Sequence, residues 1–225
     1  MNILIVGKMT SGKTTAANLL VKEIPNSKIL RLAGPVYDLV NNIDEDWKSL
    51  INKYILPYYD PRDEIQTKLG LDIPEEFYTA WHKIIFETRF IPHEKPKPRK
   101  RLQFLGTDGA RKRIDDQIWI KIADAKSKKD PNTVWIIDDC RFKNEFEWFD
   151  RNNWQSIFLF ISKETQEARI KKLYGEFDKS VLEHPSEKEI DSIRVPTECI
   201  VDSNQPPQEM LNDIKEFLCK KGLSF

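Results

Sequence analysis

Short runs of apolar residues, rich in valine, isoleucine and leucine, recur along the chain and have the length of β-strands. The runs at 133–137 and 157–161 are continuous rather than alternating, which is typical of strands buried on both faces of a parallel sheet. The first run leads directly into Gly7, and Pro25 ends the amphipathic stretch that follows. The expected strands are 2–6, 27–32, 133–137, 157–161 and 198–201.

Apolar residues with helical spacing occupy most of the chain between these runs. A turn at Ala33-Gly34-Pro35 follows the second strand and introduces one of the helices, whereas 175–196 is polar and irregular. The expected helices are 14–24, 35–42, 46–55, 74–87, 101–106, 114–126, 164–174 and 208–221. Strands that alternate with helices predict an α/β fold, a parallel sheet between two layers of helices (three-layer α/β/α).

The stretch 44–101 departs from this alternation, because it is rich in aromatic residues and broken by prolines. It ends in a basic, proline-spaced connector at 95–101. We interpret it as a helical segment inserted into one domain whose core is 1–43 and 102–225, since 225 residues suit one medium domain.

Composition and charge narrow the class of protein. The chain has 36 Lys and Arg against 36 Asp and Glu, so it lacks the basic excess of a dedicated nucleic-acid binder. No apolar run approaches the roughly 18 residues of a membrane span, and no secretory signal is visible, so we expect a cytoplasmic protein. Three cysteines without C-x-x-C spacing disfavour a disulfide framework and a zinc site.

Residues 7–14, Gly-Lys-Met-Thr-Ser-Gly-Lys-Thr, match the phosphate-binding pattern G-x-x-x-x-G-K-[ST] between a predicted strand and a predicted helix. The glycines let backbone N–H groups face phosphate oxygens, and the helix N-terminus adds partial positive charge. Lys13 would reach the β- and γ-phosphates of ATP, and the Thr14 hydroxyl would bind Mg²⁺. The predicted nucleotide contacts are Gly7, Thr10, Ser11, Gly12, Lys13, Thr14 and Thr15. The alternative is a strand-to-helix turn that matches the pattern by chance.

Two carboxylates and an arginine follow the apolar run 133–137. Ligands of open α/β sheets gather at the carboxyl ends of strands, and a carboxylate there can hold the water shell of Mg²⁺. We assign Asp138 to the metal together with Thr14, and Asp139 to catalysis, although either acid suits the metal. Arg141 could grip a phosphate with its planar fork. The alternatives are an acid that caps Arg141 or the next helix, and an arginine in solvent.

Four features of the sequence combine into a family pattern. They are residues 7–14, Leu-Ala-Gly-Pro at 32–35 with Asp38, Arg-Leu-Gln-Phe-Leu-Gly-Thr-Asp at 101–108 with Trp119, and Asp-Cys-Arg at 139–141 with Asn144 and Glu145. A weaker fifth is His-Pro-Ser-Glu at 184–187. Together they resemble the deoxynucleoside monophosphate kinases of the tailed-phage type, among the P-loop kinases. The segment 101–108 is the discriminating feature.

The resemblance implies a P-loop NTPase fold with an inserted acceptor-binding segment and a lid at about 169–196, to which Arg169 and Lys172 would contribute cations. It implies transfer of the γ-phosphoryl of ATP to a deoxynucleoside 5′-monophosphate, with Lys13, Arg141 and Asp139 as catalytic residues. The acceptor site would contain Gly34, Asp38, Arg101, Gln103, Thr107, Asp108, Arg111, Arg141 and Glu145.

For the acceptor residues, surface positions or helix caps are the alternatives. The resemblance also implies small nucleotides as the binding partners, with no nucleic acid and no membrane. It further implies a monomer or homodimer, in the host cytoplasm if the protein is phage-encoded.

The order of P-loop, Gly-Pro turn and Asp-x-Arg also resembles animal phosphomevalonate kinases, which lack the Gln-x-Leu-Gly-Thr-Asp segment at 103–108. Two further hypotheses therefore stay open. One is a P-loop kinase of a phosphorylated metabolite that is not a nucleotide. The other is an ATP-binding regulatory protein without catalysis.

Overall fold

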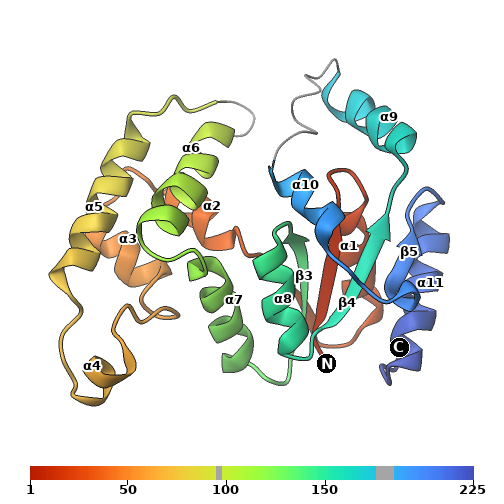
Figure 1. Ribbon diagram of the computed structural model, residues 1–225, viewed down its shortest axis with the longest axis horizontal. Coiled ribbons are helices and arrows are strands. Elements are labelled where there is room, and N and C mark those ends of the chain that lie inside the picture. The colour runs from red at the N-terminus through yellow and green to blue at the C-terminus, as the bar shows by residue number, and fades with distance from the viewer. Residues whose placement is uncertain (95–97, 176–184) are drawn as a thin grey trace. The chain divides into compact units, whose positions relative to one another are not determined.

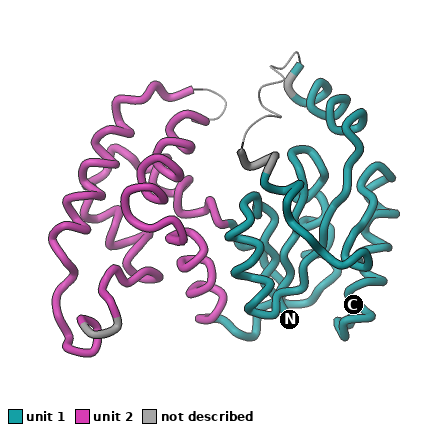
Figure 2. The backbone as a smooth tube through the Cα atoms, viewed as in Figure 1, with its two compact units in different colours: residues 1–31, 130–225 teal, residues 32–129 magenta. Residues whose placement is uncertain are grey.

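The computed structural model describes residues 1–94, 98–175 and 185–225. The chain forms two compact units (Figure 2). The first unit joins Met1–Arg31 to Asp130–Phe225, and the second is Leu32–Lys129. In the described parts of the chain, no helix combines the length and the apolar character that crossing a membrane requires.

A five-stranded parallel sheet lies at the centre of the first unit (Figure 1). Its order is β2-β3-β1-β4-β5, so the first strand lies in the middle, between β3 and β4. The strands are β1 (Ile3–Gly7), β2 (Ser27–Leu30), β3 (Val134–Cys140), β4 (Gln155–Phe160) and β5 (Ile200–Asp202). Because all pairings are parallel, the carboxyl ends of the strands meet at one edge of the sheet. The predicted α/β class is confirmed.

Helices cover both faces of this sheet. Successive side chains of a strand point to opposite faces, and Ile3 and Ile5 belong to a buried cluster with residues of α1 and α11. Leu4 and Val6 are equally buried on the other face, where α8 lies against β1 (Figure 1). The helices of this unit are α1 (Lys13–Glu23), α8 (Lys143–Arg151), α9 (Lys163–Tyr174), α10 (Pro185–Ser192) and α11 (Pro207–Lys220).

The second unit is helical and has its own buried core around Trp81, whose ring meets that of Trp119 edge to face with centroids 6.3 Å apart. Its elements are α2 (Gly34–Asn41), α3 (Trp47–Tyr54), α4 (Glu64–Lys68), α5 (Glu75–Arg89), α6 (Arg99–Gln103), a π-helix (Phe104–Arg111) and α7 (Ile118–Lys129). Residues such as Leu39 and Leu105 share this core. The compact helical unit therefore includes more of the chain, Leu32–Lys129, than the inserted segment 44–101 expected from composition.

Several elements differ from the sequence prediction. The strand expected at 133–137 continues to Cys140, and the helix expected at 101–106 is α6 followed by a π-helix. Helices α4 and α8 were not expected, and α10 lies in the stretch 175–196 expected to be irregular. Helix α8 is hard to recognise because most of its residues are polar and its buried aromatic residues are only Phe146 and Phe149. Of the predicted lid, 176–184 lies outside the described residues, and so does His184.

Candidate active site

The phosphate-binding pattern forms the connection between β1 and α1, at the carboxyl edge of the sheet. Gly12 is the N-cap of α1 with a left-handed φ of 89°, and it offers no side chain to the first N–H groups of the helix. These N–H groups have no partner within the helix and favour an anion. At Gly7, an added Cβ would lie 2.6 Å from Ser11 Oγ and 2.8 Å from Leu159 O. The shape of the loop thus favours glycine at both positions, and phosphate binding there stays a prediction.

Lys13 folds back over the loop that precedes it. Its side chain is largely buried, and Nζ donates to Gly7 O and, at 2.7 Å, to Lys8 O. Ser11 is fully buried, and its hydroxyl has no hydrogen-bond partner among the residues that the structure describes. An ammonium and an unsatisfied hydroxyl inside a glycine-bounded loop are what a phosphate group can satisfy. Thr14 and Thr15 lie exposed in the first turn of α1.

The two predicted carboxylates lie at an irregularity of β3. Leu4 pairs with Ile137 and Val6 with Cys140, so β3 carries one extra residue beside β1 at Asp138 and Asp139. Such bulges redirect side chains and are frequent beside active sites. Asp138 is buried, and its Oδ1 accepts from Arg31 Nε at 3.3 Å. The acid assigned to the metal is therefore engaged with a half-exposed arginine.

The turn after β3 is held by Glu145. Its buried Oε2 accepts from the backbone N–H groups of Arg141, at 2.8 Å, and of Phe142, at 3.0 Å. The Arg141 side chain is exposed at this turn. The structure thus gives Glu145 a role at the N-terminus of α8, while its predicted contact with an acceptor stays a prediction.

Cys140 lies at the end of β3, but its thiol is not activated as a nucleophile. Burial raises the pKa of its thiol well above the ordinary value, and the charges of Glu145 and Asp139 raise it further, against an opposing effect of Lys13. The thiol is therefore protonated at neutral pH, when a thiolate would be needed for attack.

Helices α9 and α10 contact the phosphate-binding loop. Arg169 Nη1 donates to Thr10 O at 3.2 Å, and Gln166 Nε2 donates to Met9 O at 3.1 Å. From α10, Asp191 forms an ion pair of 2.8 Å with Lys8. The guanidinium that the sequence assigns to a lid thus binds the loop backbone. Lys172, the other predicted lid cation, is exposed on α9.

In the second unit, the predicted acceptor residues fall around the π-helix Phe104–Arg111. Trp119 Nε1 donates to Gly106 O at 2.8 Å and joins this helix to α7. A π-helix is rare and is frequently found at functional sites. No signal for the π-helix is visible in the sequence, since the local pattern is equally compatible with an α-helix. It contains Thr107, Asp108 and Arg111, and Gln103 precedes it.

Some of these residues already have structural contacts. Arg101 Nε donates to Ile91 O at 2.7 Å and Nη2 to Arg89 O at 3.2 Å, so this side chain holds the end of α5. Asp108 pairs with Lys112 at 2.6 Å. Gly34 begins α2, and Asp38 lies on the same helix. Their contact with an acceptor stays a prediction.

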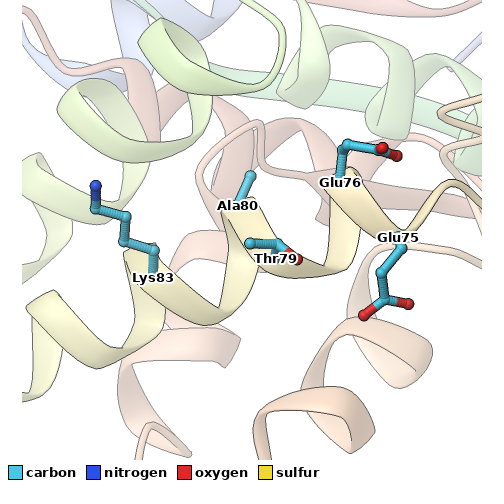
Figure 3. A pocket seen from close by; sticks show the side chains of 5 residues that line it. All are labelled: Glu75, Glu76, Thr79, Ala80 and Lys83. Atoms are coloured by element: carbon cyan, nitrogen blue, oxygen red, sulfur yellow. The ribbon is translucent and has the colours of Figure 1, made fainter.

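A surface hollow of about 320 Å³ lies on α5, and all its lining residues come from that helix (Figure 3). They are Glu75, Glu76, Thr79, Ala80 and Lys83. Two carboxylates and one ammonium give this hollow a net negative charge, which disfavours the binding of a phosphate. We therefore do not assign the nucleotide to this hollow.

Comparison with known proteins gives one informative relative. No family model matches the chain. The chain is 25% identical to a deoxynucleoside-5′-monophosphate kinase of Escherichia phage T5, and the alignment covers 82% of each protein. Solved structures with similarity include a gluconokinase from Sinorhizobium meliloti 1021, with 12% identity, 98% and 92% coverage and a TM-score of 0.44. A sugar kinase from Janibacter sp. HTCC2649 has 14% identity, 97% and 94% coverage and the same TM-score.

At these TM-scores the solved structures carry no argument about the substrate. The phage relative and the loop geometry together support a kinase of the P-loop type.

Proposed function

We propose that the protein transfers the γ-phosphoryl group of ATP to the 5′-phosphate of a deoxynucleoside monophosphate. The observation that carries the nucleotide part is the loop itself, in which the buried Lys13 ammonium and the unsatisfied Ser11 hydroxyl lie beside the N-terminus of α1. The acceptor part is supported by the similarity to the phage kinase and by the segment 101–108.

The reaction breaks the bond between the γ-phosphorus and its bridging oxygen and forms a bond to an acceptor phosphate oxygen, so ADP leaves. The acceptor is already an anion and needs no strong general base, so the chain has to position the groups and neutralise charge. The loop N–H groups would bind the phosphates, and Lys13 would exchange its contacts with Gly7 O and Lys8 O for phosphate oxygens. Arg141 would hold the acceptor phosphate.

Magnesium fits this site as an ion held partly by the substrate. The described residues contain no group of three or more acidic, histidine or cysteine side chains that could hold a metal alone. Mg²⁺ is usually bound by one or two protein oxygens together with phosphates and water. Thr14 and one of Asp138 and Asp139 would hold it, and bound Mg²⁺ would neutralise charge on the phosphates.

The activity can be tested by measuring ADP release in a coupled assay with ATP, Mg²⁺ and each of dTMP, dGMP, dCMP, dAMP and dUMP. We expect turnover above the no-acceptor rate with at least one of them. Turnover with mevalonate phosphate alone would show that the protein is a P-loop kinase of a phosphorylated metabolite that is not a nucleotide. ATP binding without turnover on any acceptor would leave a regulatory nucleotide binder and contradict the proposal.

Arg141→Ala should raise the KM for the monophosphate by about tenfold or more, because the variant loses charge-assisted hydrogen bonds to a phosphate. The KM for ATP should stay the same. Initial rates over both substrates measure the two constants separately. The matched control is Arg151→Ala, which removes an exposed arginine at the far end of α8. A change confined to the KM for ATP would instead place Arg141 on the donor side.

A further inference from the structure

The apex of the phosphate-binding loop has a backbone conformation that needs support. Thr10 has a φ of 61°, in the left-handed region, although it carries a β-branched side chain. Such a conformation costs about 1–2 kcal/mol per residue and persists only where the surroundings hold it. The residues that hold Thr10 therefore contribute to the shape of the loop.

Two side chains of α9 bind the carbonyl groups on either side of this apex. Gln166 Nε2 donates to Met9 O at 3.1 Å, and Arg169 Nη1 donates to Thr10 O at 3.2 Å. In a planar trans peptide the C=O and the following N–H point in opposite directions. Fixing the Met9 carbonyl on the α9 side therefore directs the N–H group of Thr10 away from α9, while the Ser11 N–H donates to Lys8 O at 3.2 Å.

Both donors are themselves held in place. Gln166 is only 4% exposed, and its backbone N–H donates to Ser162 O at 2.9 Å. The second branch of the Arg169 guanidinium, Nη2, donates to Ser203 O at 2.5 Å, directly after β5. Ser203 N donates in turn to Phe160 O at 2.8 Å, at the end of β4. The loop is thereby connected through one guanidinium to the edge of the sheet.

We propose that Gln166 and Arg169 are positioning residues that hold the Met9 and Thr10 carbonyls, and with them the left-handed apex of the loop, in the conformation that binds the nucleotide phosphates. The proposal rests on the proposed function in that it takes this loop as the ATP site. It differs from the role expected of Arg169 as a lid cation, which would act on the transferring group and change kcat. A positioning residue acts on the affinity for the polyphosphate.

The test uses the full chain and measures binding before activity. Gln166→Glu retains the size of the side chain but places a carboxylate against Met9 O, and Arg169→Lys retains the charge but loses the two-branched contact. We expect both variants to raise the Kd for ATP, and for inorganic tripolyphosphate, by about tenfold. Calorimetry without acceptor measures both constants. Arg169→Ala should weaken both more than Arg169→Lys, and the acceptor KM should change less than twofold.

The control is Lys171→Ala, which removes an exposed cation from the same helix and should leave both Kd values unchanged. Thermal unfolding without ligand identifies a variant that fails to fold. If a variant at Gln166 or Arg169 does not fold, the Kd values of the variant at the other position test the proposal. Unchanged Kd values in both variants, or a loss confined to kcat, would overturn the proposal. So would a wild-type chain that binds neither probe. A wild-type chain that binds ATP but phosphorylates no monophosphate would contradict the proposed function alone.

Discussion

Lys13→Ala is expected to lower kcat by about two to three orders of magnitude, the size of effect seen when a preorganised donor to developing charge is removed. The ammonium is largely buried beside the N-terminus of α1 and donates to the carbonyl groups of Gly7 and Lys8. Phosphate oxygens can replace these carbonyls, with a gain from opposite charge. Steady-state rates of ADP release at saturating acceptor measure the effect.

The fold should survive this change, since the buried cluster behind α1 consists of residues such as Ala16, Ala17 and Leu20 rather than Lys13. Thermal unfolding without ligand checks that point. Lys22→Ala is the matched control, because Lys22 is an exposed lysine in the last turn of the same helix, and its rate should equal that of the wild type. A Lys13→Ala enzyme with normal turnover and a normal melting profile would show that the loop is not catalytic.

Much of the fold can be predicted from the sequence because the buried strands are short, continuous apolar runs. Residues 157–161 illustrate this, and β4 (Gln155–Phe160) differs from them by one or two residues at each end. The end of β3 cannot be found in this way, because two acidic residues normally indicate that a buried strand has ended. Here the bulge beside β1 and the contact with Arg31 let Asp138 lie buried within the strand.

The candidate site likewise contains features that can be predicted from the sequence and features that cannot. The loop at 7–14 is predictable because all its required residues lie within one short continuous segment. The contacts of Arg169 with Thr10 and Ser203 depend on packing between segments far apart in the chain, so no local pattern reports them. Glu145 is a different case, because its contact with Arg141 is local, but the short separation suggests a shared ligand as readily as a helix cap.

Gly7→Ala is expected to weaken the Kd for ATP by at least about tenfold and to lower the free energy of unfolding by about 1–3 kcal/mol, the usual cost of an added methyl group in a packed site. The new Cβ would lie 2.6 Å from Ser11 Oγ and 2.8 Å from the backbone oxygen of Leu159. Ser11 is fully buried, and a backbone oxygen in β4 cannot rotate away, so the loop itself must shift. Calorimetry with ATP and urea denaturation measure the two effects.

Gly222→Ala separates this steric effect from backbone strain. Gly222 has a φ of 91°, but an added Cβ there would meet no atom within 4 Å. This control should lose roughly 1 kcal/mol of stability through strain alone and keep the wild-type affinity for ATP. Comparison of the two variants thus separates a loss of stability from a loss of ATP affinity. Of the two glycines, only Gly7 lies against both the loop hydroxyl and strand β4. An ATP affinity in Gly7→Ala equal to that of Gly222→Ala would mean that nucleotide binding does not depend on the close packing of this loop.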